Sequence, residues 1–273
     1  MDQCHLGAGW RTCRTDRRGP HRFGGDQPRG SSRAASGTRY EWVIVDFGIL
    51  AAGAATTTVY PSTNAEDTAF IVANSGSRVV VAENQSQVDK LTANRADLPA
   101  VEKVVIIDGT SEDDWVITLD ELEQLGKQLL ADQPTAVTDR IDAIPPEQLA
   151  TLIYTSGTTG KPKGVRLHHE AWTYTAAALD SLNVLSDQDL NYLWLPLAHS
   201  FGKVMLAMPL LMGFPTVIDG RVDKIVENLA VINRRLWGGC AAHLREGARP
   251  HHRDDGRRGR REEAALRLGQ RCG

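Results

Sequence analysis

The sequence lacks cysteine over most of its length, since Cys4, Cys13, Cys240 and Cys272 all lie near its two ends. No two of these cysteines have the two-residue spacing of a zinc knuckle, so we expect no metal site. A long apolar run is also missing: residues 204–218 form the longest one, and two prolines interrupt it. Such a segment is too short and too broken to cross a bilayer. Because the first thirty residues contain no apolar signal region, we expect a soluble, cytoplasmic protein.

Lysine is absent from both ends of the chain. Residues 1–39 carry eight Arg and three acidic residues, and residues 234–273 carry eleven Arg and five acidic residues. The middle, residues 40–233, carries seven Lys and five Arg against 26 acidic residues, a net charge of −14. An arginine- and glycine-rich composition without lysine is typical of a GC-rich gene read in the wrong frame. We favour this interpretation of both ends, and disordered basic tails are the alternative.

This partition predicts three segments. Residues 1–40 are expected to be a basic segment of low order, residues 41–233 a folded domain, and residues 234–273 an arginine-rich, disordered tail. The arginine run at 257–261 is typical of nucleic-acid or anionic-surface binding. The acidic middle argues against nucleic acid as a partner, while peripheral membrane contact and the oligomeric state stay open.

The middle segment alternates expected strands and helices. Its strands are expected at 56–60, 78–82, 103–107, 149–155, 164–168, 190–195 and 214–218. Its helices are expected at 43–53, 63–76, 85–96, 118–129, 170–182, 198–211 and 221–232. Strands that recur after helical spacers indicate an α/β fold with a mixed, largely parallel sheet and packed helices.

Local signals fix some boundaries more sharply. Thr63 and Thr118 each precede a glutamate by three positions, which is the spacing of a capping box at a helix start. Residues 131–146 are polar and end in two prolines, so we expect a linker there.

The most distinctive stretch is the one between the strands expected at 149–155 and 164–168. Residues 154–165 read Tyr-Thr-Ser-Gly-Thr-Thr-Gly-Lys-Pro-Lys-Gly-Val and contain no acidic residue. Glycines allow a tight turn with exposed N–H groups, hydroxyls donate hydrogen bonds to phosphate oxygens, and lysine supplies a compact positive charge. The stretch therefore predicts a loop that holds a chain of phosphates. A mobile polar hairpin is the alternative.

Two common phosphate-binding motifs are excluded by the spacing. Only two residues separate Gly157 from Gly160, and Pro162 follows Lys161, so the Gly-x-x-x-x-Gly-Lys-Ser/Thr loop does not match. The loop also contains no Gly-x-Gly-x-x-Gly, which the dinucleotide fingerprint requires.

The loop resembles, over about ten contiguous positions, the Ser/Thr/Gly-rich loop of the acyl-adenylate-forming enzymes. Residues 49–63 resemble the alanine-rich helix that runs into a strand ending in Tyr-Pro in acyl-CoA ligases, and residues 195–201 resemble a downstream segment of the same enzymes. The order and spacing fit the long-chain fatty-acid–CoA ligase branch over roughly 42–233. The resemblance implies a partial N-terminal AMP-binding domain at 41–233, with fatty acid, ATP and CoA as substrates.

The resemblance also implies roles for single residues. The triphosphate would be held by hydroxyls and amides of the loop, with Lys163 as the cation and Mg²⁺ bridging phosphate oxygens. His199 would lie near the acyl group, or it would simply cap a helix. His168 and His169 are expected to satisfy local hydrogen bonds rather than to bind ligands. The implied nucleotide contacts are Thr155, Ser156, Gly157, Thr158, Thr159, Gly160 and Lys163, and the implied catalytic residues are Lys163 and His199.

Parts of the family pattern are not recognisable after Asn233: the adenine-stacking segment, an acidic residue for the ribose, and a mobile domain carrying a lysine. Asp219-Gly220-Arg221 looks like the hinge before that domain but comes too early in the chain. We therefore expect a truncated ligase with little or no activity alone. The alternatives are a non-catalytic nucleotide or phosphate binder and, less favoured, an arginine-rich nucleic-acid binder.

Overall fold

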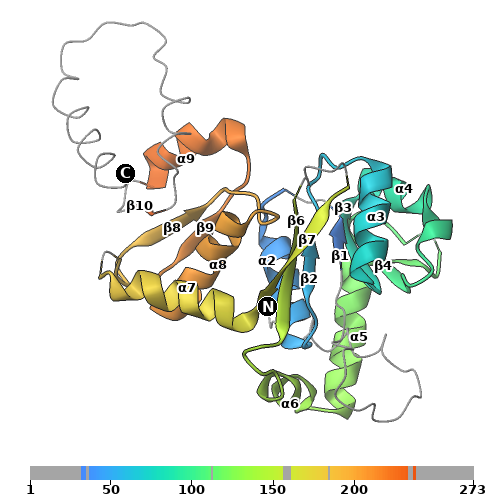
Figure 1. The fold of residues 1–273 in the computed structure, drawn as a ribbon, viewed down its shortest axis with the longest axis horizontal. Coiled ribbons are helices and arrows are strands. Elements are labelled where there is room, and N and C mark those ends of the chain that lie inside the picture. Colours follow the sequence, from blue (N-terminus) through green and yellow to red (C-terminus); the bar gives the residue numbers. More distant parts are fainter. Residues whose placement is uncertain are drawn as a thin grey trace, which may run out of the picture.

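The computed structural model describes residues 32–34, 37–111, 113–155, 161–183, 185–232 and 236–237. These residues form two sheets with helices packed against them (Figure 1). In Figure 1, the smaller sheet with α7 and α8 lies to the left of the larger sheet, and α3, α4 and α5 lie to its right.

The larger sheet has seven strands in the order β5-β4-β3-β1-β2-β6-β7. All its neighbours pair in parallel except β6 and β7, which form an antiparallel edge. This is the mixed, largely parallel α/β sheet that the sequence predicts. Its strands are β1 Ser32–Ala34, β2 Thr56–Thr58, β3 Val79–Asn84, β4 Lys103–Asp108, β5 Val116–Thr118, β6 Leu149–Thr155 and β7 Lys163–His168.

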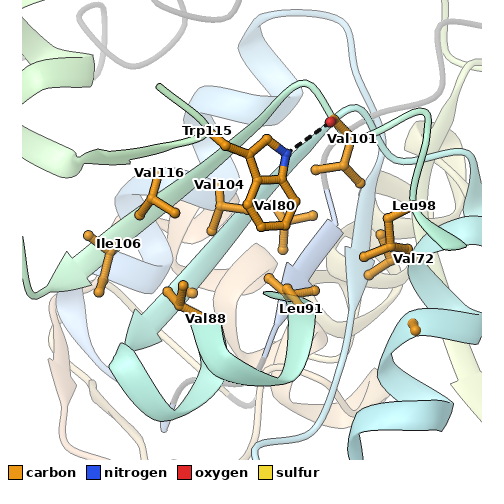
Figure 2. Packing of buried hydrophobic residues seen from close by; sticks show 12 residues of the cluster. Val72, Val80, Val88, Leu91, Leu98, Val101, Val104, Ile106, Trp115 and Val116 are labelled. Carbon is orange, nitrogen blue, oxygen red and sulfur yellow. Dashed lines mark hydrogen bonds between the residues drawn. The ribbon is translucent and has the colours of Figure 1, made fainter. Parts of the chain in front are cut away.

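Strands β3 and β4 are apolar on both sides because helices cover both faces of the sheet. On one face, α3 Ala65–Ser75 and α4 Gln85–Thr92 enclose a cluster that includes Val80, Leu91 and Ile106. Trp115 completes this cluster and donates a hydrogen bond of 3.1 Å from Nε1 to the carbonyl of Val101 (Figure 2). On the other face, α2 Tyr40–Ala51 and α5 Leu119–Asp132 contribute to a second cluster around Val81.

The smaller sheet is β10 Leu236–Trp237, β8 Leu190–Leu193 and β9 Thr216–Ile218, in that order and parallel. The helices α7 His169–Ser181 and α8 Ser200–Met212 pack against each other, and η2 Val222–Lys224 leads into α9 Ile225–Ile232. No helix in the described part of the chain is long and apolar enough to cross a membrane.

Helix starts test the two capping-box predictions. Thr118 does cap α5, since its Oγ1 accepts from the amide of Glu121 while the Glu121 carboxylate accepts from the amide of Thr118. The prediction at Thr63 is wrong by one residue: Asn64 caps α3, and its Oδ1 accepts from the amide of Asp67 at 2.7 Å. Asparagine is at least as good an N-cap as threonine, which explains the shift.

Several other expectations need correction. Residues 131–146 are not a plain linker, because they contain α6 Ala136–Asp142. The expected helix at 85–96 ends at Thr92 and is followed by a separate 3-10 turn, η1 Arg95–Asp97. Three strands, β1, β5 and β10, were not predicted at all, and β10 lies within the segment 234–273. Strand β1 lies within the segment 1–40, and the three-segment division remains a prediction.

Candidate functional site

The β6–β7 hairpin presents the two described ends of the glycine-rich loop. Thr155 ends β6 directly opposite Lys163, which begins β7, and the antiparallel register continues through Tyr154 and Gly164. Both Thr155 and Lys163 are exposed, whereas most of β6 is buried. The carboxyl end of the buried strand β6 and the start of β7 thus place a hydroxyl and an ammonium group opposite each other in solvent. Ligands of open α/β sheets bind at this end of the strands.

The central loop residues, Ser156, Gly157, Thr158, Thr159 and Gly160, lie outside the described residues, so their expected roles stay predictions.

Lys161, the first described residue after the loop, has a different environment from Lys163. Its Nζ lies 5.4 Å from the centre of the Phe70 ring of α3. A cation over an aromatic face contributes about 0.5–1 kcal/mol at an exposed site. This contact anchors the returning arm of the loop to α3.

Tyr154 fixes the base of the hairpin. Its hydroxyl donates a hydrogen bond of 2.7 Å to Oδ1 of Asn74 in α3, and burial raises the pKa of its phenol above the usual value. A Cβ added to Gly164 would lie only 3.0 Å from the Tyr154 ring. Glycine at 164 therefore lets β7 cross closely over the tyrosine, which keeps Lys163 in register with Thr155.

His199 lies at the N-terminus of α8, where its Nδ1 accepts a hydrogen bond of 3.2 Å from the amide of Phe201. In the structure His199 therefore caps a helix, and its proximity to an acyl group remains a prediction. The preceding residue, Ala198, connects the start of α8 to the large sheet. Its carbonyl accepts from Oγ1 of Thr58 at 3.5 Å, and Thr58 pairs with Ile153 of β6. His199 and the loop thus lie toward the same end of the large sheet.

The local segment before α8 is tightly packed. A Cβ on the buried Gly202 would lie 2.3 Å from the carbonyl oxygen of Pro196, and Leu197 and Ala198 are buried. His199 itself is exposed, as are Pro196 and Ser200 on either side of this buried pair.

A buried ion pair that the sequence does not predict joins two helices. Nζ of Lys203 in α8 lies 2.5 Å from Oδ2 of Asp46 in α2, and the two side chains are only 4% and 1% exposed. Nζ of Lys203 also lies 5.4 Å from the centre of the Trp42 ring. The sequence does show one charged residue inside each of two apolar segments that are expected to be helical. It does not show that these two residues, 157 positions apart, contact each other.

The two histidines of the β7–α7 junction differ in environment. Exposed His168 precedes α7, and its Nδ1 lies 3.7 Å from Glu170. His169 is half-buried, and burial together with the nearby charge of Lys203 lowers the pKa of its imidazole. Its Nε2 is buried and has no hydrogen-bond partner within the described ranges. His169 thus departs from the expectation that both histidines satisfy local hydrogen bonds.

The segment that looks like a hinge is locally bonded. Asp219 accepts hydrogen bonds from the backbone amide and the guanidinium of Arg221, which hold the pKa of its carboxyl well below the usual range. Among the residues with described positions, no group of three or more His, Cys, Asp or Glu could hold a metal ion.

Known proteins are similar to this chain in sequence and in fold. The family model for "AMP-binding enzyme" matches residues 34–243. The chain belongs to the AMP-binding enzyme family. The match covers most of the large sheet and the glycine-rich loop, and it extends on either side of the predicted domain at 41–233.

Within the AMP-binding enzymes, the similar curated proteins are acyl-CoA ligases. The chain is 33% identical over 172 residues to long-chain-fatty-acid–CoA ligase FadD15 of Mycobacterium bovis, covering 62% of this chain and 28% of the relative. It is 34% identical over 166 residues to long-chain-fatty-acid–CoA ligase ACSBG2 of Xenopus laevis, covering 58% and 22%. The chain thus spans about a quarter of the length of the curated relatives it matches.

Solved structures with the same fold include a long-chain-fatty-acid–CoA ligase, FadD1, from Archaeoglobus fulgidus, with a TM-score of 0.67 and 18% identity, covering 85% of this chain and 41% of that one. The anthranilate CoA ligase AuaEII, solved with anthranoyl-AMP, gives a TM-score of 0.68 and 20% identity, covering 85% and 42%. At these identities the likeness establishes the fold alone.

Proposed function

We propose that this chain supplies the triphosphate-binding part of a long-chain fatty-acid–CoA ligase. The observation that carries the proposal is the register of the β6–β7 hairpin, which places Thr155 opposite Lys163 at the carboxyl end of a buried strand. A hydroxyl and an ammonium group at the two ends of a glycine-rich turn suit a row of phosphate oxygens. The family match supports ATP as the source of those phosphates.

The reaction proposed for the whole ligase has two steps. A fatty carboxylate attacks the α-phosphorus of ATP, forming acyl-AMP and releasing pyrophosphate, and the thiol of CoA then displaces AMP to give the thioester. The first step builds negative charge on the leaving pyrophosphate. Lys163 would offset that charge, and the hydroxyls and amides of residues 155–160 would orient the β and γ phosphates.

Mg²⁺ fits this site only through the nucleotide. The described residues offer no cluster of carboxylates for it, so its ligands would be phosphate oxygens and water. Its contribution when bound is neutralisation of phosphate charge, which complements Lys163.

His199 would face the acyl carboxylate from the start of α8. Its cap bond to the Phe201 amide fixes the ring, and Thr58 ties the preceding carbonyl to the sheet that carries the loop. This arrangement supports a role in orienting the acid rather than in moving a proton.

We further propose that the chain alone binds nucleotide but has little or no ligase activity. Adenine stacking, ribose contacts and closure over the substrates need groups that are not recognised in this sequence, and without closure water would enter the site.

Binding is tested by titrating ATP with Mg²⁺ into the purified chain and following ³¹P resonances and heat. Lys163→Ala is expected to weaken ATP binding by about tenfold, which corresponds to about 1.4 kcal/mol. Lys161→Ala is the matched control, because Lys161 contacts Phe70 and is expected to change ATP binding less than Lys163 does.

Activity is tested by fatty-acid-dependent exchange of pyrophosphate into ATP. We expect ATP binding without exchange. Clear exchange that Lys163→Ala abolishes would overturn the proposed inactivity while supporting the ligase site. Absence of ATP binding, or equal loss in the two lysine variants, would contradict the site itself.

A further inference from the structure

A cavity of about 320 Å³ lies between α2, α7 and α8, away from the glycine-rich loop. Its volume is within the range of small-molecule sites. None of Thr155, Lys163 and His199 lines it. A ligand in this cavity would therefore bind apart from the proposed nucleotide site.

The walls of this cavity are mostly apolar. Phe47 and Leu50 come from α2, Trp172 and Ala176 from α7, and Leu206 from α8, together with Ala207, Leu210 and Leu211. Leu210 and Leu211 are 64% and 54% exposed, so the cavity opens to solvent beside them. A second hollow of about 420 Å³ shares Leu50, His169 and Thr173 with it, so the two hollows adjoin each other.

Three ionisable side chains interrupt the apolar walls: Asp46, Lys203 and His169. Oδ2 of Asp46 is bonded to Lys203, but its Oδ1 is buried without a hydrogen-bond partner in the described structure, as is Nε2 of His169. A buried polar atom left unpaired carries a desolvation cost that no hydrogen bond offsets. One donor delivered to Oδ1 of Asp46 would remove that cost.

The charges of Asp46, Lys203 and His169 determine which head group of a ligand the cavity can bind. Asp46 and Lys203 cancel each other, and the burial that lowers the pKa of His169 favours its neutral form. A carboxylate head group would add a negative charge next to Asp46, and an ammonium would add a positive one next to Lys203. An uncharged hydroxyl or primary amide can donate to Asp46 without disturbing the pair.

We propose that this cavity binds an uncharged amphiphile, an alkyl chain that ends in a hydroxyl or primary amide, with its head group at Asp46 and Lys203 and its chain along α7 and α8. The apolar chain would be buried against Leu206 and Trp172, where the removal of each methylene from water favours binding.

The test titrates 1-octanol into the full chain labelled with 5-fluorotryptophan and follows the fluorine resonances. We expect a saturable shift at Trp172, which lines the cavity, and none at Trp115, which belongs to a separate cluster. Trp172→Phe identifies the resonance. Octanoate at the same concentration is expected to bind at least about tenfold more weakly than octanol.

Two neighbouring alanines of α7 provide a matched pair. Ala176 is buried against the cavity and Ala177 is exposed, so Ala176→Leu fills the cavity while Ala177→Leu adds the same bulk outside it. Octanol affinity should fall about tenfold in the first variant and stay the same in the second. If Ala176→Leu does not fold, Ala207→Leu fills the same cavity from α8.

The proposal is overturned if octanol produces no saturable shift at Trp172, if Trp115 shifts in parallel, or if the filling variant binds as tightly as its control. Tighter binding of octanoate would overturn the assignment of an uncharged head group.

Discussion

At the scale of single residues, the ion pair of Asp46 and Lys203 joins α2 to α8 inside the protein. Taking two charges out of water is costly, and their attraction offsets the cost only while both are present. The pair also contacts Trp42 and lies near His169, so residues from three helices meet around it. Sequence reasoning could not place it, because the pairing follows from how α2 and α8 cross rather than from local pattern.

Lys203→Met should therefore destabilise the chain by about 3–5 kcal/mol, because it leaves a buried carboxylate without a partner. The double variant Asp46→Leu with Lys203→Met should recover most of that loss, since no charge is then buried. Chemical denaturation of the single and double variants measures both values. A double variant no more stable than Lys203→Met would contradict this account.

His169 predicts a pH dependence of stability. Its pKa is lowered in the folded chain by burial and by Lys203 of α8, with Asp46 of α2 and Glu170 nearby. The unfolded chain therefore takes up this proton first as the pH falls. Stability is unaffected above the unfolded pKa of about 6.5 and decreases below it, until the folded form is protonated too.

His169→Gln should remove this loss of stability as the pH falls below about 6.5, as measured by denaturation at a series of pH values. His168→Gln serves as the control, because it removes a neighbouring but exposed imidazole. A slope that persists in His169→Gln would assign the pH dependence to another group.

At the scale of helices and strands, the sequence predicts a boundary correctly where the interactions that set it are local. Thr118 and Glu121 form the predicted capping box because both partners lie within one turn of α5. Helix α6 was missed because its stability comes from tertiary contacts: Ala136 and Val137 are buried, and Arg140 donates to the carbonyl of Ala52 at 2.8 Å. Tertiary packing provides most helix stability in proteins, so a short polar helix leaves little local signal.

Thr118→Ala should destabilise the chain by about 1 kcal/mol, because the amide of Glu121 loses the hydroxyl that accepts from it. Thr138→Ala in the interior of α6 is the control, since Thr138 is exposed and alanine is the better helix former. Thermal unfolding of the two variants makes the comparison. Equal effects would mean that the cap contributes nothing specific.

Trp115 illustrates an element boundary set by packing. It precedes β5, a strand the sequence did not predict, and its ring lies in the cluster shared with β4 and α4 (Figure 2). Trp115→Phe keeps most of the apolar ring but leaves the carbonyl of Val101 unpaired, so we expect a loss of about 1–3 kcal/mol. Denaturation measures it, and a loss below about 0.5 kcal/mol would indicate that water replaces the indole, since surface changes stay within that limit.

At the scale of the whole molecule, the sheet order explains which site predictions could be made. The loop and its flanking strands could be predicted because their residues are contiguous in the sequence. The structure adds the strand register, in which Thr155 lies opposite Lys163. The relation of His199 to that loop depends on Thr58, which pairs with β6 and contacts Ala198 across 140 residues of sequence. Such a relation appears only when β2 and β6 are neighbours in the sheet.

The same sheet order leaves β7 at an edge, paired with β6 alone among the described strands. An exposed edge offers unpaired backbone groups to a second chain, and Val165, 46% exposed in the middle of β7, adds an apolar contact.

Lys163 and Arg166 oppose such pairing by charge, so association should increase with salt as screening reduces their repulsion. Val165→Lys should lower the association measured by light scattering at high salt, whereas Val222→Lys, at a valine outside the sheets that is even more exposed (71%), should not. Association that both variants reduce equally would place the contact elsewhere than at the β7 edge.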